Sequence, residues 1–93
     1  MLLRISSGHL NAFFNLANWI SSDVVRLLRD ERIRSKTSMI RLAEKSGLSV
    51  AMISYVERGL RNPTLDTLLR IAIALDVDLW RLIKRASIAP TAK

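Results

Sequence analysis

The sequence SMIRLAEKSGLSVAMISYVERGLRN, residues 38–62, contains two short helical patterns on either side of a tight turn. Ser38 can cap the first helix, because its hydroxyl can accept a hydrogen bond from a free amide of the first turn. Gly47 falls where a helix can end in a left-handed residue, a conformation that costs glycine nothing. Ser49 can cap the second helix, which ends before Gly59. The pattern predicts a helix-turn-helix, whose second helix can present its outer face to a duplex groove.

The rest of the chain favours an all-helical domain with a basic surface. Its 93 residues allow one domain with a modest core. Apolar residues make up 49%, and only two prolines and three glycines interrupt helix formation. Fifteen Lys and Arg against eight Asp and Glu give a net charge of +7. A polyanionic partner is the natural inference, nucleic acid ahead of a membrane surface, although a basic surface can also serve solubility alone.

The sequence lacks the residues that disulfide, metal and catalytic sites require. The sequence has no cysteine, which excludes disulfides and removes the commonest zinc ligand. The single histidine, His9, is interpreted as a surface residue, so no metal site and no cofactor are expected. No histidine–nucleophile pair or glycine-rich phosphate loop indicates an enzyme. No apolar run approaches the ~18 residues of a membrane-spanning helix.

Residues 1–21 are expected to form an N-terminal extension. Asn11, Asn15 and Asn18 interrupt its apolar residues and no cleavage site follows, so the segment is not interpreted as a signal peptide and a cytoplasmic protein is expected. Apolar residues at helical spacing predict a short amphipathic helix: Leu10, Phe13, Phe14, Ala17 and Ile20. This helix either packs on the core of the domain, or uses aromatic side chains for self-association. The aromatic candidates are Phe13, Phe14 and Trp19.

The domain itself is expected at residues 22–86. Ser21-Ser22-Asp23 predicts a helix start, and the basic link that follows this helix contains Arg34 and Lys36, which either contact phosphate or are simply solvated. The expected core residues before the turn are Val24, Val25, Leu27, Leu28, Ile40, Leu42 and Ala43. Those after it are Leu48, Ile53, Val56, Leu65, Leu68, Leu69, Ala72, Ile73, Leu75, Leu79, Leu82 and Ile83.

The last two helices are predicted by their caps. Thr64 is expected to cap a core helix, and Asp78 a final one. Trp80 falls between the inward positions of the final helix, where it either covers the core or contacts a second copy. The chain is expected to fray from Ala86 onward, which leaves residues 87–93 as a flexible tail.

Residues from about 22 to 85 resemble the lambda-repressor-like, Cro/C1-type (XRE family) helix-turn-helix domain. The resemblance is carried, in this order, by the strings LRDER, LAEKSGLS, ISYVERG, NPTLDTLLRIA and LDVDL. It implies an all-α, compact bundle of about five helices, to which the N-terminal amphipathic helix is an addition. It also implies binding to operator double-stranded DNA, commonly as a homodimer on a two-fold site, in order to regulate transcription, for example as a repressor.

The family's site residues carry over by position. The resemblance implies that contacts with base edges come from Val50, Ala51, Ser54 and Tyr55. Phosphates are implied for Ser38, Met39, Ser49, Arg58, Arg61 and Asn62, and the basic link adds Arg34 and Lys36 as candidates. Where the family often has a glutamine that clamps phosphate, Met39 can offer only its backbone amide.

Glu57 matches a family glutamate that pairs with an arginine of the first helix. Arg29 is the preferred partner and Arg32 the alternative, because the residues 33–36 replace what is usually a single glycine and blur the register. A buried pair of this kind orients helices more surely than it stabilises them.

The expected outer face of the second helix departs from the family. Val50, Ala51 and Met52 occupy it, without the polar forks that read bases. Affinity is therefore expected to come from Arg and Lys on phosphates, with relaxed or shape-dependent readout. The sequence predicts a sequence-preferring DNA-binding regulator. The alternative is a module that keeps the fold but binds a regulatory protein partner, such as a toxin.

Overall fold

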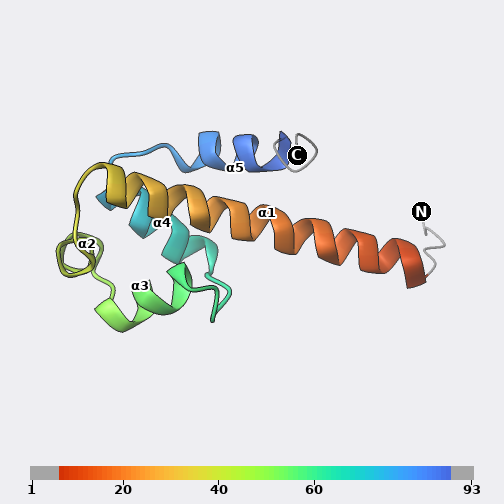
Figure 1. Cartoon of the computed structure of the whole chain (residues 1–93), viewed down its shortest axis with the longest axis horizontal. Coiled ribbons are helices and arrows are strands. Elements are labelled where there is room, and N and C mark those ends of the chain that lie inside the picture. The colour runs from red at the N-terminus through yellow and green to blue at the C-terminus, as the bar shows by residue number, and fades with distance from the viewer. Residues whose placement is uncertain (1–6, 89–93) are drawn as a thin grey trace.

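Five α-helices make up the described part of the chain (Figure 1). The computed structural model describes the backbone of residues 7–88 and the side chains of residues 18–87, and it contains no strand within that range. The helices are α1 (Ser7–Arg34), α2 (Met39–Ser46), α3 (Val50–Glu57), α4 (Leu65–Ala74) and α5 (Leu79–Ile88). The predicted all-α class and the bundle of about five helices are confirmed. Over residues 7–88, no helix is both long and apolar enough to cross a membrane.

The first helix differs from its prediction. It runs without interruption from Ser7 to Arg34, so the predicted helix start at Ser21-Ser22-Asp23 is wrong, and the N-terminal amphipathic segment continues into the helix of the domain. No proline or glycine follows Gly8 within α1, and serine inside a helix costs only a few tenths of a kcal/mol relative to alanine, roughly. The predicted side-chain roles of His9, Phe13 and Phe14 lie outside the residues whose side chains are described.

α1 is the axis of the bundle. α5 runs beside its C-terminal half, and α3 and α4 lie on the other side, while the N-terminal half of α1 projects beyond them (Figure 1). Each helix contributes to the core, in which Leu42 and Ile53 are completely buried. The other core residues are Val24, Leu27, Leu28, Val56, Leu68, Ile71, Ala72, Leu79, Leu82 and Ala86.

The caps are confirmed. The hydroxyl of Ser38 accepts the amide of Arg41 at 3.0 Å, and that of Ser49 accepts the amide of Met52 at 3.0 Å. The hydroxyl of Thr64 accepts the amide of Thr67 at 3.1 Å at the start of α4, and the carboxylate of Asp78 accepts the amide of Trp80 at 3.0 Å at the start of α5. Gly47 has φ 75°, and its amide donates to the Ala43 carbonyl at 3.0 Å, which closes α2 in the predicted left-handed turn.

Four predicted core residues instead face solvent. Ile40 is 65% exposed, because α2 turns Leu42 and, in part, Met39 towards the core instead. Leu65, Leu69 and Ile73 are also exposed, since α4 buries the neighbouring line of Leu68, Ile71 and Ala72. α4 carries more apolar residues than one face can bury, so its sequence alone did not reveal which line faces inward.

The C-terminal prediction also needs correction. Ala86 is fully buried and α5 extends to Ile88, so the chain does not fray from Ala86 onward. Ala86 lies seven residues after Leu79 and four after Leu82, which places all three on one face of α5. The inward apolar positions of α5 therefore include Ala86, and the helix extends two residues beyond it.

Candidate nucleic-acid interface

The α2–turn–α3 unit presents one side of α3 to solvent. Val50 is 41% and Tyr55 40% exposed, Ala51 is exposed and Ser54 is half-buried. Ile53 and Val56 fix the opposite side of α3 in the core. Because the positions of a helix repeat every 3.6 residues, burying Ile53 and Val56 on one side directs Val50 and Tyr55 towards solvent.

A buried ion pair ties α3 to α1. Glu57, with a side chain 7% exposed, accepts two bonds from Arg32, at 2.7 Å from Nε to Oε2 and 3.0 Å from Nη2 to Oε1. Arg32 also donates to the Thr37 carbonyl at 2.9 Å, so it holds the link that leads into α2. A bidentate arginine–carboxylate contact fixes the relative orientation of the two groups as well as their distance.

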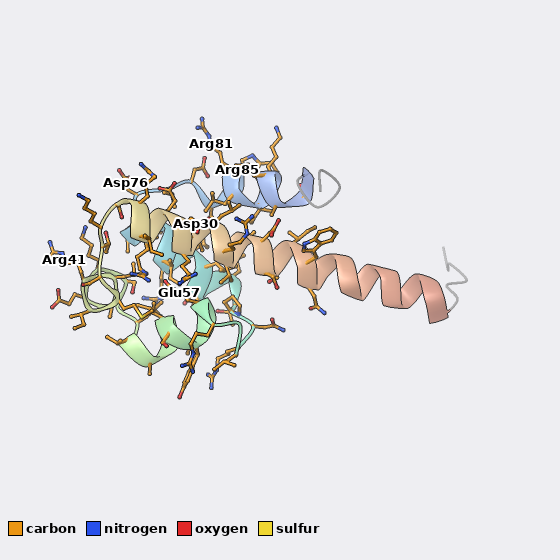
Figure 2. All side chains as sticks on the ribbon, in the orientation of Figure 1. Asp30, Arg41, Glu57, Asp76, Arg81 and Arg85 are labelled. Atoms are coloured by element: carbon orange, nitrogen blue, oxygen red, sulfur yellow. The ribbon has the colours of Figure 1, made fainter. Side chains whose placement is uncertain are left out.

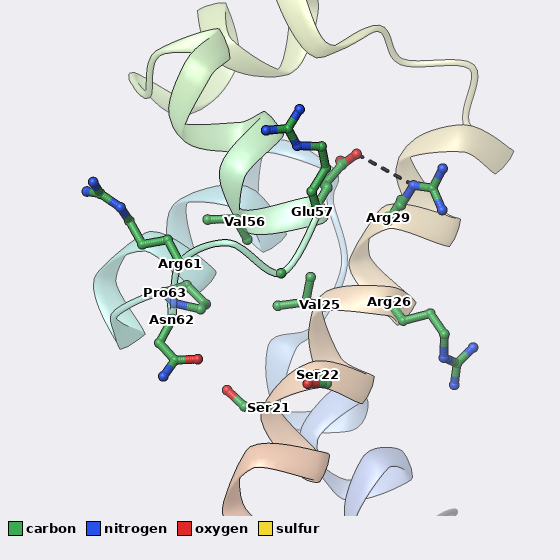
Figure 3. A pocket seen from close by; sticks show the side chains of 12 residues that line it. Ser21, Ser22, Val25, Arg26, Arg29, Val56, Glu57, Arg61, Asn62 and Pro63 are labelled. Atoms are coloured by element: carbon green, nitrogen blue, oxygen red, sulfur yellow. Dashed lines mark ion pairs between the residues drawn. The ribbon is translucent and has the colours of Figure 1, made fainter.

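Arg29, the preferred partner in the sequence analysis, takes the lesser role. Its Nε lies 3.8 Å from Oε1 of Glu57, and its side chain is 54% exposed (Figure 3). Arg29 and Arg32 are three residues apart and share a face of α1, so spacing alone could not separate them. The difference in burial decides for Arg32, whose side chain is 12% exposed against 54% for Arg29.

Two arginines flank the exposed tyrosine. The guanidinium carbon of Arg58 lies 5.8 Å from the centre of the Tyr55 ring, and that of Arg61 lies 5.9 Å from it. Both distances suit a cation–π contact. The cluster joins the last turn of α3 to the loop that follows, so two positive charges lie beside the outer face of α3.

The basic link divides into a paired and an unshielded part. Nη2 of Arg34 lies 2.6 Å from Oε2 of Glu31. This hydrogen bond lowers the pKa of the Glu31 carboxyl and raises the pKa of Arg34. Arg34 must therefore exchange a carboxylate for any phosphate it contacts. Lys36 is exposed and has φ 58°, a left-handed conformation that glycine adopts with less strain.

At the start of α2, backbone amides rather than side chains are available to contact a phosphate. The Ser38 hydroxyl is already bonded to the Arg41 amide, and Met39 packs partly against the core. Arg41 is exposed on α2, at the left of the view in Figure 2, whereas Arg81 projects from α5 at its top. Positively charged side chains thus lie on several faces of the molecule, and only some of them border α3.

A cavity of about 230 Å³ opens between α1 and the loop that follows α3 (Figure 3). Its walls include Ser22, Val25, Arg29, Gly59, Asn62 and Pro63. Asn62 and Arg61 come from the loop, and the Arg61 and Arg26 side chains point away from one another on opposite sides (Figure 3). The hollow separates the loop's basic residues from those of α1, so the two groups do not form one cluster.

Comparison with known proteins decides the family. Residues 28–79, more than half of the chain, match the family described as Helix-turn-helix. The chain belongs to this helix-turn-helix family. The match begins in the last two turns of α1 and ends at the start of α5, so it includes the α2–α3 unit and the Arg32–Glu57 pair.

Two curated relatives of this helix-turn-helix chain are transcriptional regulators by name. The uncharacterised HTH-type transcriptional regulator Rv0474 of Mycobacterium tuberculosis is 48% identical over 61 residues, 66% of this chain and 44% of that protein. The HTH-type transcriptional regulator SutR of Escherichia coli is 41% identical over 63 residues, 68% of this chain and 33% of that protein. The chain therefore spans less than half the length of these relatives. No solved structure gives a significant match.

The helix-turn-helix chain leaves its two described tryptophans accessible. Trp80 on α5 is 67% exposed, so most of its surface does not cover the core, and Trp19 on α1 is 44% exposed. Among the residues that the structure describes, no group of three or more metal-binding side chains comes together.

Proposed function

We propose that this chain binds double-stranded DNA through the outer face of α3 and regulates transcription. The observation that supports this most directly is the exposed line of Val50, Ala51 and Tyr55 on a helix whose opposite side is buried. A helix held in this way can enter the major groove with its first turns against base edges. The names of the relatives support a role in transcription.

Phosphate contacts supply most of the affinity in this proposal. Arg58 and Arg61 border α3, Arg34 is the last residue of α1, and Lys36 lies in the link before α2. The outer face itself offers small apolar groups and one phenol, which can contact thymine methyls and make a single hydrogen bond. The chain is therefore expected to prefer certain sites by DNA shape as much as by base identity.

The proposal includes a second copy of the chain. A homodimer on a two-fold site would present two α3 helices, with half-sites about one helical turn, or ~34 Å, apart. Trp80 and Trp19 are exposed enough to contribute to self-association, and Phe13 and Phe14 are the further candidates from the sequence.

Selection from a random duplex pool tests the proposal. Bound sites should share a preferred sequence with two-fold symmetry, and binding should weaken with salt by roughly one log–log unit per phosphate contacted. Tyr55→Ala should change the preference between sites, whereas Arg61→Ala should weaken all sites alike. A chain that fails to shift mixed genomic fragments in dilute buffer would refute the proposal.

One observation favours a second function. Val50 and Ala51 leave the outer face of α3 without charge, and Trp80 adds an exposed aromatic on α5. A protein partner could dock on such apolar groups, as aromatic side chains are enriched at interfaces. The same gel shift separates the two functions, because a protein-binding module would leave DNA unshifted.

A further inference from the structure

The outer side of α5 carries positive charge that the proposed α3 interface does not use. Three exposed cations lie there, Arg81, Lys84 and Arg85, beside Trp80, which is 67% exposed. Positions 81 and 85 are four residues apart, as are 80 and 84, so the four side chains form two adjacent rows, each about 6 Å long. The opposite side of α5 is buried in the core: Leu79, Leu82 and Ala86.

Carboxylates compensate these cations only in part. Oδ2 of Asp78 lies 4.0 Å from Nε of Arg81, and the two side chains are 59% and 83% exposed. An exposed pair of this kind is weak, so a phosphate can displace the carboxylate at little cost. The hydrogen bond from Arg34, and to a smaller degree the charge of Arg85, lowers the pKa of Glu31. Glu31 is therefore shared between two arginines and does not neutralise Arg85.

α5 and α3 lie on opposite sides of α1 (Figure 1). Arg81 projects from α5 on the side away from α1 (Figure 2). A duplex bound on the outer face of α3 therefore leaves the outer side of α5 uncovered.

We propose that the outer side of α5 binds the phosphate backbone of a second DNA segment, so that one chain connects two segments. The proposal rests on the function proposed for α3, which binds the first segment, and adds a second surface to it. Arginine and lysine bind backbone phosphates without regard to sequence. The indole N–H of Trp80 is a further donor that a phosphate oxygen can accept.

The side chains of this face favour phosphate over other anionic partners. A helix that binds a membrane surface inserts its apolar side, but that side of α5 is buried in the core. The centre of a protein interface is depleted in charge and lysine, whereas three of the four side chains here are charged. DNA held by α3 also brings neighbouring duplex within reach, which raises the effective concentration of the second ligand.

The second contact should be weak and sensitive to salt. With two or three phosphates contacted, a fourfold rise in salt should weaken capture of the second segment by roughly 10–40-fold. The α3 surface has both a groove-facing helix and its own cations, so it binds first. In dilute protein with one short duplex, substitutions on α5 should therefore leave the affinity and its salt slope unchanged.

A bridging assay tests the second site. One duplex is fixed to beads and saturated with the chain, and capture of a fluorescent second duplex is measured in dilute salt. The variant Arg81→Gln/Lys84→Gln/Arg85→Gln should capture at least about fivefold less of the second duplex. The double variant Arg81→Gln/Lys84→Gln keeps Arg85 beside Glu31 and should show a smaller loss in the same direction. Circular dichroism checks that both variants keep their helices.

A matched control removes the same charge elsewhere. Arg26→Gln/Lys45→Gln/Arg70→Gln takes three exposed cations from α1, α2 and α4. It should capture the second duplex at least about fivefold better than the triple α5 variant. The two triple variants should bind a single duplex with affinities within about twofold of one another. Equal capture by the two overturns the inference, because bridging would then depend on net charge alone or on the two α3 surfaces of a dimer.

Two further measurements identify other occupants of the face. Sedimentation should give the triple α5 variant the same mass as the wild type. A loss of capture that accompanies a loss of mass assigns the face to self-association and overturns the inference. Vesicles of phosphatidylserine are the second probe. Wild-type chain that binds them through α5 but captures no second duplex assigns the face to a membrane, which overturns the inference as well.

The result is separable from that for the α3 site. A wild-type chain that shifts a single duplex but captures no second one overturns the α5 site and leaves the proposed function intact. A chain whose single-duplex binding is lost in the α5 variant and kept in Arg61→Ala refutes the proposed α3 site instead.

Discussion

The outer faces of α3 and α4 are both apolar at their centres, yet their borders differ. Around α3, Tyr55 is flanked by the guanidinium groups of Arg58 and Arg61, which bring positive charge without a carboxylate between them. Around α4, Arg70 is already paired with Asp66. An apolar strip edged by uncompensated cations suits a polyanion, whereas one edged by balanced charge suits a second protein surface.

The difference also concerns how each helix is held. α3 has only eight residues and two core side chains, and the Glu57–Arg32 pair helps to orient it, whereas α4 has ten residues and three core side chains. The α3 surface should therefore be the more sensitive of the two to a single polar substitution.

Arg32→Ala should have the largest effect. It leaves the Glu57 carboxylate buried without its two hydrogen bonds, and breaking a buried pair in this way costs about 3–5 kcal/mol. Urea unfolding measures the loss. Arg29→Ala is the matched control, because its longer contact is exposed and should contribute less than about 1 kcal/mol. Equal losses in the two variants would show that α3 is not held by Arg32.

Arg61→Ala should come next, through DNA affinity. Removing one phosphate contact should lower the log–log salt slope by about one unit and weaken binding to all duplexes alike. Fluorescence anisotropy at several salt concentrations gives both values. Arg81→Ala removes an arginine from the α5 side of the molecule and should leave the slope unchanged. If the two variants behave alike, the positive border of α3 has no special role.

The ends of the two helices offer a further contrast. α3 is followed by Gly59 at φ 72°, whereas α4 is followed by Asp76 at φ 59°, a left-handed residue with a side chain. Asp76→Gly should raise the free energy of unfolding by up to about 1 kcal/mol, because glycine adopts this conformation without a Cβ clash. Thermal unfolding measures it, with Asp76→Ala as the control that keeps the strain. A glycine variant no more stable than the alanine variant would show that the strain is negligible.

The sequence contained most of the fold because its local signals agree. Ser38, Gly47 and Ser49 carry the caps and the turn that define the α2–α3 unit, and each has one physically favoured role. Where two options satisfied the same pattern, sequence could not decide. Arg29 and Arg32 share a face of α1, and α4 offers two apolar lines of which only one is buried. These choices depend on which neighbour lies opposite, which only the three-dimensional packing supplies.

The candidate site was less accessible from sequence than the fold. The Arg58–Tyr55–Arg61 cluster spans a helix end and a loop, so its assembly depends on the loop's path. Arg34 and Glu31 are three residues apart on one helix, so their pairing could have been predicted from the spacing. Its consequence, that a proposed phosphate contact is already occupied, follows only once the 2.6 Å distance is known.

Glu31→Gln tests that consequence and should have the smallest effect. Removing the carboxylate frees the Arg34 guanidinium at the end of α1 without touching the core, because the pair is largely exposed and contributes little to stability. DNA affinity should therefore rise by up to about fivefold. Glu44→Gln is the matched control, because Glu44 pairs with Arg41 at 3.8 Å on α2 and makes the same change in net charge. A larger rise for Glu31→Gln than for Glu44→Gln assigns the gain to Arg34. Equal rises would mean that only net charge matters, and would remove Arg34 from the proposed phosphate contacts.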